Sequence, residues 1–316
     1  MKKIAVVTRD CAGINAAIRS VVRAATGLGL DVMGVMRGYD GLMEDDLVPL
    51  DRKAVAGIIS RGGTILKTAR AQRFKSVEGQ KKALESVKKH EIDGMIVIGG
   101  NGSLAGAHVL AGYGIPVVGV PATIDNDVSG VDMTIGTDTA INVAMDAVDK
   151  IRDTVNSLQR IFVVEIMGRE CGYLALQVAM AGGCEEVMIP ERENDLDAMC
   201  AEIMAGETLG KASWIIIVAE GTGKAHEVAE AITAKTGFET RSAVLGHIQR
   251  GGSPTAFDRI LAGRLGSFAV ETLLAGKTDC CVGRSGDRMF TLPLTEAIKG
   301  RRFDAEGAYR LMKMLS

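Results

Sequence analysis

The sequence predicts an α/β fold in which a parallel β-sheet is covered by helices on both faces. Short apolar runs alternate with longer amphipathic segments along most of the chain, which is the pattern of repeated βαβ units. The chain has 39 glycines but only 7 Phe, 4 Tyr and 1 Trp, so its core is built from aliphatic residues. This composition favours tightly packed strand–turn–helix units over an aromatic-rich β-sandwich.

The apolar runs predict the strands, and the amphipathic segments predict the helices. The predicted strands are residues 3–7, 31–36, 94–98, 116–120, 160–166, 186–189 and 213–219. The clearest predicted helices, in which apolar residues recur every three or four positions, are residues 15–28, 76–89 and 140–153.

A length of 316 residues predicts two domains. The polar turn 136–140 leads into a long helical pattern and is the best candidate for the first crossing between them. The polar stretch 246–254 is the candidate for the return. The expected domains are residues 1–136 with 252–303, and residues 137–251, followed by a C-terminal helix over 304–316.

Charge and apolar run lengths exclude several classes of partner. Lys and Arg number 37 against 39 Asp and Glu, a formal net charge of −2, which disfavours binding to nucleic acid or to an anionic membrane. No apolar run approaches the ~20 residues that span a bilayer, and the apolar run after the two N-terminal lysines is too short for a signal-peptide core. We expect a cytoplasmic protein whose six cysteines, which lack metal-ligand or CxxC spacing, are buried free thiols.

The residues directly after the predicted strands are the candidates for chemistry, because ligands bind parallel sheets at the carboxyl ends of the strands. Residues 99–103, Gly-Gly-Asn-Gly-Ser, follow strand 94–98 and precede a helix. Such a turn cradles phosphate, or it is simply a tight connection. Asp125 and Asp127 follow strand 116–120. They indicate either a general base with a metal- or phosphate-orienting partner, or a turn and helix cap.

Two arginine-containing segments complete the candidate residues. Arg169 follows the fifth predicted strand beside a glycine, where it would stabilise a transferring phosphoryl group or pair with Glu170 on the surface. Arg241, His247 and Arg250 lie close together in a Gly-rich polar segment. They predict a clamp for an anionic sugar phosphate, because arginine suits bidentate contact with phosphate, whereas a lone histidine is usually structural.

Four motifs carry a family resemblance. They are Thr-Ile-Asp-Asn-Asp at 123–127, Met-Gly-Arg at 167–169, Ala-Glu-Gly at 219–221 and Leu-Gly-His-Ile-Gln-Arg-Gly-Gly-Ser-Pro at 245–254. In this order and spacing they resemble the bacterial 6-phosphofructokinase family, in its ATP-dependent branch, over nearly the whole chain.

The resemblance implies the phosphofructokinase fold, with two doubly wound, Rossmann-like parallel-sheet domains. The nucleotide-side domain would be residues 1–136 with 252–303, and the sugar-phosphate-side domain residues 137–251. It also implies a homotetramer with sites shared between subunits. The implied reaction is transfer of a phosphoryl group from ATP to the C1 hydroxyl of fructose 6-phosphate in glycolysis, giving fructose 1,6-bisphosphate and ADP, with Mg²⁺ as cofactor.

The resemblance also assigns roles to residues. Asp125 matches the base for the C1 hydroxyl, with Thr123 and Asp127 beside it, and Arg169 matches the transition-state arginine. The implied sugar-phosphate residues are Thr123, Ile124, Asp125, Arg160, Met167, Gly168, Arg169, Glu220, Arg241, His247 and Arg250, with Arg160 and Arg241 serving a neighbouring subunit. The implied nucleotide residues are Arg70, Gly100, Asn101, Gly102 and Ser103. An implied effector site for ADP or phosphoenolpyruvate at a subunit boundary comprises Arg19, Arg23, Arg52, Arg152, Glu185 and Lys211.

Three departures from the family pattern fall on the nucleotide side. The loop 8–15 is two residues shorter than the family's TSGGDxPG loop and lacks its double glycine. Asn101 stands where the family has a magnesium-binding aspartate, so this metal position lacks a charge. Ala122 stands where ATP-using members have Gly and pyrophosphate-using members have Lys.

These departures leave two alternatives beside an ordinary kinase. One is a catalytically weakened family member that acts as a regulatory subunit and binds a sugar phosphate or an effector. The other is a kinase with an altered phosphoryl donor or sugar acceptor.

Overall fold

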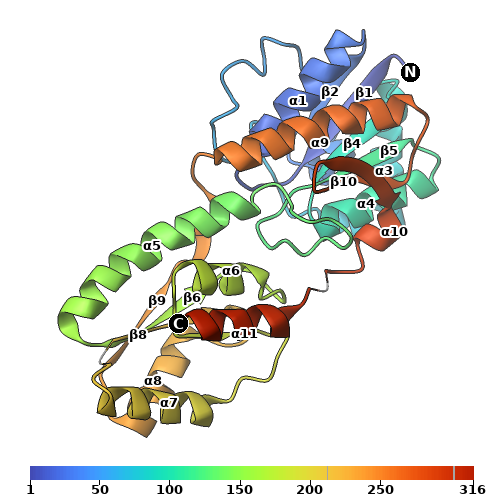
Figure 1. Ribbon diagram of the computed structural model, residues 1–316. Coiled ribbons are helices and arrows are strands. Elements are labelled where there is room, and N and C mark those ends of the chain that lie inside the picture. Colours follow the sequence, from blue (N-terminus) through green and yellow to red (C-terminus); the bar gives the residue numbers. More distant parts are fainter. Residues whose placement is uncertain (212, 302) are drawn as a thin grey trace. The chain divides into compact units, whose positions relative to one another are not determined.

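The computed structural model describes residues 1–211, 213–301 and 303–316, and the chain forms two compact units (Figure 1). The first unit comprises Met1–Thr139 and Arg250–Arg301, and the second comprises Ala140–Gln249 and Arg302–Ser316. The sequence placed the crossings at 136/137 and 251/252, whereas the units change over at 139/140 and 249/250. The C-terminal helix α11 (Ala305–Leu315) belongs to the second unit.

The first unit is built on a seven-stranded sheet with the order β11-β10-β5-β4-β1-β2-β3. Its five central strands run parallel: β1 (Lys3–Thr8), β2 (Asp31–Val35), β4 (Gly94–Gly99), β5 (Val117–Pro121) and β10 (Cys280–Ser285). The edge strands β3 (Leu47–Pro49) and β11 (Arg288–Pro293) are antiparallel to their neighbours.

The two edge strands add antiparallel pairs to the predicted parallel sheet. β10 and β11 are joined by the two-residue turn Gly286-Asp287, in which Gly286 has φ +55°. A connection this short reverses the chain into a hairpin, whereas a parallel pair needs a crossover.

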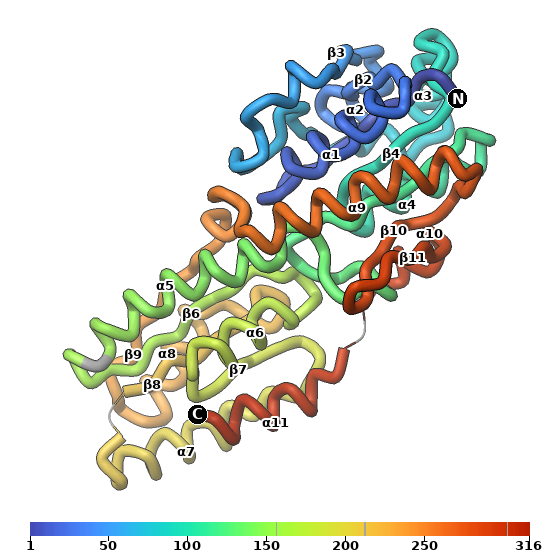
Figure 2. Tube along the Cα trace, turned by 45° about the horizontal axis from the view of Figure 1, so that its top comes forward, coloured from blue at the N-terminus to red at the C-terminus, as the bar shows by residue number. Residues whose placement is uncertain are grey.

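Helices cover both faces of this sheet (Figure 2). One face carries α2 (Tyr39–Met43), the short 3₁₀ helix η1 (Gln72–Lys75), α3 (Val77–Lys89), α4 (Asn101–Gly112) and α10 (Leu294–Ala297), whose side chains share one buried cluster with the strands. On the other face α1 (Ile14–Gly27) packs against α9 (Ala256–Leu274). The core is aliphatic, as the composition predicts.

The chain order around β1 marks where this sheet binds ligands. From β1 the chain goes outward through β2 and β3, then crosses back to β4 on the other side of β1 and continues to β5. The direction of winding therefore changes between β1 and β4. In open α/β sheets the crevice beyond the carboxyl ends of two such strands is the expected ligand position.

The second unit is built on a four-stranded parallel sheet with the order β7-β8-β6-β9. Its strands are β6 (Ile161–Ile166), β7 (Glu186–Met188), β8 (Trp214–Ala219) and β9 (Thr240–Val244). α7 (Leu196–Thr208) and α8 (Ala225–Thr236) share a buried cluster with β6 and β8. α6 (Tyr173–Ala181) packs against α11, and α5 (Thr137–Leu158) leads the chain into this unit.

All seven predicted strands are confirmed, with ends that move by no more than one residue. The predicted helix 140–153 is longer than expected, because α5 begins at Thr137 and ends at Leu158. Four strands escaped prediction: β3, β9, β10 and β11. β9 is an edge strand whose residues are mostly exposed, so it lacks the apolar run that marks a buried strand.

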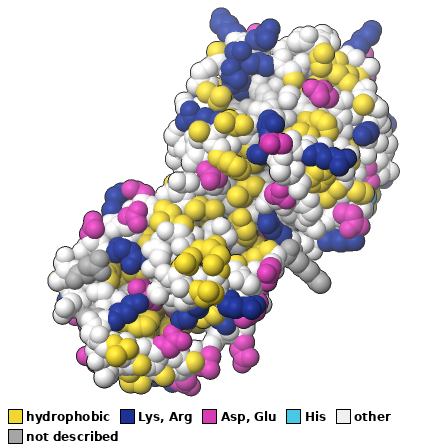
Figure 3. All heavy atoms as spheres, viewed as in Figure 1, with side chains coloured by type: hydrophobic (Ala, Val, Ile, Leu, Met, Phe, Trp, Pro, Cys, Tyr) yellow, Lys and Arg dark blue, Asp and Glu magenta, His cyan; other side chains and the backbone are white. Residues whose placement is uncertain are grey.

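The surface and the thiols agree with the composition. On the face drawn in Figure 3, basic and acidic side chains are interspersed over most of the surface. No helix among the described residues is long and apolar enough to cross a membrane. All six cysteines are buried and unpaired, as predicted, and burial raises the pKa of the Cys11 and Cys281 thiols.

Candidate functional site

The turn between β4 and α4 lies at the carboxyl end of the central strand β4. β4 ends at Gly99, and α4 begins at Asn101 with Gly100 as its N-cap. A Cβ on Gly99 would lie 2.6 Å from Ser103 Oγ, and one on Gly100 would lie 3.1 Å from Thr123 Cβ. Gly99 therefore has no room for a side chain, and a side chain at Gly100 would require Thr123 to shift by a few tenths of an ångström. No side chain caps α4 and no acidic residue occupies its first turn, so the N–H groups of Asn101 and Gly102 are available to an anion, whereas the Ser103 N–H donates to the Gly100 carbonyl at 2.9 Å.

The turn 123–127 after β5 is fixed by side chains from the segment that leads into α5. Thr134 Oγ1 donates to the Thr123 carbonyl at 2.7 Å, and Thr137 Oγ1 donates to it at 3.1 Å. Asn126, which has φ +50°, accepts from the Thr134 N–H at 2.9 Å. No helix follows this turn directly, because α5 begins only at Thr137, so the alternative of a simple helix cap is wrong.

Asp125 sits inside this turn as a nearly buried carboxyl group. It is 2% exposed, its Oδ2 accepts from Thr123 Oγ1 at 3.2 Å, and its own N–H donates to the same hydroxyl at 3.2 Å. The side chain of the predicted substrate residue Ile124 is 1% exposed and belongs to the core. A contact between Ile124 and a substrate would therefore involve its backbone.

Asn101 and Asp127 form the candidate cation position. Asn101 Nδ2 donates to Asp127 Oδ2 at 2.9 Å and to the Asp127 carbonyl at 3.1 Å. The other amide atom, Asn101 Oδ1, is buried and has no hydrogen-bond partner among residues 1–211, 213–301 and 303–316. A buried oxygen without a donor next to a carboxylate fits a hard cation that takes most of its ligands from phosphate and water. The described residues contain no group of three or more acidic, His or Cys side chains that would hold a metal alone.

Residues after β1 hold the loop 61–70 by hydrogen bonds. Asn15 is buried and fixes the loop 61–65, donating to the Arg61 carbonyl at 3.0 Å and accepting from the Ile65 N–H at 2.8 Å. Arg9 Nη1 donates to the Ala69 carbonyl at 2.6 Å, directly before the predicted nucleotide residue Arg70. The predicted nucleotide-side residues Arg70, Gly100, Asn101, Gly102 and Ser103 all belong to the first unit.

In the second unit, the turn 167–169 after β6 is fixed through its backbone. The Met167 N–H donates to Gln249 Oε1 at 2.9 Å. Glu220 Oε1 accepts from the Gly168 N–H at 3.2 Å and from the Arg169 N–H at 2.7 Å. Gly168 has φ +150°, and a Cβ there would lie 2.4 Å from the Cys171 carbonyl oxygen, so only glycine fits. Arg169 is held in the left-handed region, with φ +55°.

One carboxylate pairs with both arginines that the resemblance assigns to a neighbouring subunit. Glu239 Oε2 lies 3.0 Å from Arg160 Nη2, and its other oxygen pairs with Arg241. Glu239 therefore links the two guanidinium groups.

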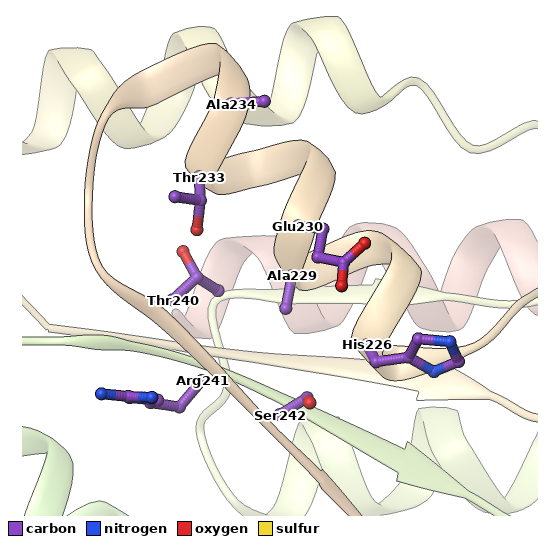
Figure 4. Close-up of a pocket in the computed structure, with 8 residues that line it drawn as sticks. All are labelled: His226, Ala229, Glu230, Thr233, Ala234, Thr240, Arg241 and Ser242. Atoms are coloured by element: carbon purple, nitrogen blue, oxygen red, sulfur yellow. The ribbon is translucent and has the colours of Figure 1, made fainter.

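Arg241 also lines a pocket of about 510 Å³ between α8 and the edge strand β9 (Figure 4). In Figure 4, His226 and Glu230 project from α8, and Thr240, Arg241 and Ser242 belong to β9. His247 is exposed and Arg250 half-buried; both lie in the short 3₁₀ helix η2 (Gly246–Arg250), where the chain returns to the first unit.

The predicted effector residues divide between the two units. Arg19 and Arg23 lie one turn apart on α1, and Arg52 follows β3. The others lie together in the second unit, where Lys211 Nζ is 3.4 Å from Glu185 Oε1 and Arg152 donates to the Gly182 and Gly183 carbonyls.

Three residues that support the site were missed by the sequence reasoning: Asn126, Glu239 and Gln249. Asn126 and Gln249 stand inside the motifs that carried the resemblance, and both are 0% exposed. A buried amide inside a polar motif is a signal for a positioning role, because such a group needs hydrogen-bond partners. Glu239 carried no signal, because an acidic residue two positions before an arginine is common on surfaces.

The winding of the first sheet and the bare α4 N-terminus beside an acidic turn define a phosphate-binding α/β protein. The phosphofructokinase family model matches residues 3–273. The chain belongs to the phosphofructokinase family.

Curated relatives match over the full length of the chain. An ATP-dependent 6-phosphofructokinase of Clostridium tetani is 49% identical over 320 residues, and one of Thermotoga neapolitana is 48% identical over 319, with 100% of both chains covered in each case. Among solved structures, phosphofructokinase from Saccharomyces cerevisiae superposes with a TM-score of 0.88 at 35% identity. That match covers 95% of this chain and 45% of the yeast chain.

Proposed function

We propose that this protein transfers the γ-phosphoryl group of ATP to the C1 hydroxyl of fructose 6-phosphate in glycolysis, giving fructose 1,6-bisphosphate and ADP. The observation that carries the proposal is the fixed turn 123–127, which holds the buried Asp125 carboxyl group beside the β4–α4 turn. The 48–49% identity to full-length ATP-dependent relatives supports the same donor and acceptor.

Asp125 acts as the base in this proposal. Its carboxylate takes the proton of the C1 hydroxyl, and the sugar oxygen then forms the new bond to the γ-phosphorus. The bond between that phosphorus and the β-phosphate oxygen breaks, and ADP leaves with the electron pair. The Thr123 hydroxyl orients the carboxylate by its hydrogen bond to Oδ2.

Arg169 stabilises the charge that develops on the transferring group. Glu220 fixes the backbone of Arg169, so its exposed side chain extends from a defined point of the turn, and its guanidinium contacts the transferring phosphoryl group. The sugar phosphate is bound by Met167, Gly168, His247 and Arg250. Glu220 holds the turn 167–169 by accepting hydrogen bonds from its N–H groups.

Asn101 Oδ1 and the Asp127 carboxylate are the groups that would hold Mg²⁺ on the nucleotide side. When bound, the cation neutralises charge on the terminal phosphates of the donor. Arg70, Gly100, Gly102 and Ser103 complete the nucleotide contacts, the last three through the α4 N-terminus.

We further propose a cytoplasmic homotetramer in which Arg160 and Arg241 serve a neighbouring subunit. β9 is an exposed sheet edge, and near it Val244 and Ile248 are 59% and 58% exposed. An exposed edge strand with large apolar side chains is suited to contact with a second copy. Arg19, Arg23, Arg52, Arg152, Glu185 and Lys211 then form an effector site for ADP or phosphoenolpyruvate at a subunit boundary. Light scattering on the purified protein tests the assembly.

A coupled assay of the wild-type protein with fructose 6-phosphate, ATP and Mg²⁺ tests the activity, beside calorimetric binding of the sugar phosphate. We expect ATP-dependent formation of the bisphosphate. Fructose 6-phosphate binding without product from any nucleotide or from pyrophosphate would instead establish the regulatory-subunit alternative. Turnover with another donor or sugar alone would establish the altered kinase.

A further inference from the structure

Arg9 occupies the position at which the first sheet changes its direction of winding. It directly follows β1, and its N–H donates to the Ile98 carbonyl of β4 at 3.1 Å. The register pairs Thr8 with Ile98, so the carboxyl ends of β1 and β4 lie side by side. Arg9 therefore begins the chain segment that borders the expected ligand crevice.

The side chain of Arg9 lies against Gly99, the last residue of β4. Its Cγ lies 3.2 Å from the place that a Cβ on Gly99 would occupy, so the aliphatic part rests on the glycine backbone. The hydrogen bond from Nη1 to the Ala69 carbonyl then holds the guanidinium next to the loop that carries Arg70. The residue is half-buried, which limits the conformations of its long side chain.

The surroundings of this guanidinium suit phosphate. The first turn of α4 contributes backbone N–H groups and no acidic residue, and Asn101 at its start is neutral. Arg9, whose Cγ lies against Gly99 directly before this turn, carries a planar guanidinium that matches the geometry and charge of phosphate oxygens. The loop after β1 lacks the consecutive glycines that would bring backbone N–H groups to the same place.

We propose that Arg9 binds the terminal phosphates of the phosphoryl donor through its guanidinium group. This side chain then takes the place of the backbone N–H groups that a glycine-rich loop would offer to the phosphates. The inference rests on the proposed function, because it takes the nucleotide to bind at the β1–β4 crevice. It makes Arg9 a binding residue for the donor, with no contact to the sugar.

Calorimetric binding of ATP and of AMP to wild type, Arg9→Ala and Arg9→Lys tests this assignment, with fructose 6-phosphate binding as the measure of an intact fold. AMP lacks the phosphates that Arg9 would contact. We expect Arg9→Ala to weaken ATP binding by about 10- to 100-fold, the range for a lost charge-assisted contact. AMP and fructose 6-phosphate affinities should stay unchanged, and Arg9→Lys should fall between wild type and Arg9→Ala.

Arg264→Ala is the matched control, because Arg264 is an exposed arginine of the same unit whose side chain lies 3.5 Å from Asp287 on the surface. ATP affinity equal to or tighter than wild type in Arg9→Ala overturns the assignment, and tighter binding would show that the side chain obstructs the donor. Equal loss of ATP and AMP binding also overturns it, because the effect would not depend on the terminal phosphates.

The two proposals fail in distinguishable ways. A wild-type protein that makes fructose 1,6-bisphosphate while Arg9→Ala keeps full ATP affinity overturns the role of Arg9 alone. A wild-type protein that binds ATP in an Arg9-dependent manner but forms no product overturns the proposed reaction alone.

Discussion

The loops at the carboxyl ends of the two sheets present different groups to a ligand. In the first unit, the β4–α4 turn offers backbone N–H groups at the start of an uncapped helix. In the second unit, the N–H groups of Met167, Gly168 and Arg169 are all taken by Gln249 and Glu220. The first region therefore has backbone N–H groups to offer an anion in addition to its side chains, whereas these three N–H groups of the second region are already bonded within the protein.

This difference has a consequence for substitution. A backbone cradle depends on glycines whose place has no room for a side chain, such as Gly99. A side-chain clamp depends on the few groups that fix its backbone. Two kinds of substitution test this difference between the regions. One changes a reacting group in the first region, and the other changes a supporting group in the second.

The largest effect is expected for Asp125→Asn in the first region. The amide cannot accept the C1 proton, so kcat should fall by about 10²- to 10⁴-fold with little change in the affinity for fructose 6-phosphate. Steady-state kinetics and calorimetry measure the two quantities. Asp197→Asn is the control, because Asp197 pairs with Lys235 on the surface of α7. A kcat close to wild type in Asp125→Asn would remove Asp125 as the base.

The next effect is expected in the second region, for Glu220→Ala. Loss of the carboxylate releases the N–H groups of Gly168 and Arg169, so the KM for fructose 6-phosphate should rise by about 10- to 100-fold while the KM for ATP stays constant. Glu220→Gln keeps an acceptor oxygen and should recover part of the loss. Equal changes in both KM values would contradict a role confined to the sugar-phosphate side.

A smaller effect is expected for Asn101→Asp, which adds a carboxylate beside Asp127. The Mg²⁺ concentration for half-maximal turnover should fall by about 10-fold, because the cation would gain a charged ligand. Without Mg²⁺, two neighbouring carboxylates repel, so the variant should unfold at a lower temperature than wild type. An unchanged Mg²⁺ requirement would show that the cation binds elsewhere.

The smallest effect is expected away from both regions, at Asp45 in the first unit. Its hydrogen bonds to Lys89, His90 and Ser86 lower its pKa to about 2. Because the folded pKa lies below the ordinary value of 3.8, this stabilisation is complete above that value and is lost as the pH falls towards 2. Urea unfolding at pH 6 and pH 3 measures the free energy of unfolding, and Asp45→Asn should lower that free energy more at pH 6 than at pH 3. An equal difference at both pH values would contradict the link to ionisation.

The sequence predicted local features well where the pattern is strong. The buried strands β1, β4, β5, β6 and β8 are continuous apolar runs, which is why their bounds were found within one residue. β9 and β11 were missed because they are edge strands with exposed residues. The turns directly after these strands were also located, because the end of each apolar run marks where the turn begins.

The supporting contacts of the candidate site were less accessible to sequence reasoning. Gln249 reaches Met167 across 82 residues, and Glu220 reaches Arg169 across 51. The polar character of these residues is visible in the sequence, but their partners are set by which strands become neighbours. Sheet order is decided by packing across the whole unit, and no short pattern specifies it.

The sequence by itself determined seven of the strands and the turns that carry polar residues, because periodicity and glycine content act over a few residues. Only the tertiary structure decided that β1 lies beside β4, with Arg9 across Gly99, and that Glu239 pairs with both Arg160 and Arg241. Those arrangements follow from burying the apolar faces of separate elements together. That burial brings residues distant in sequence to one position.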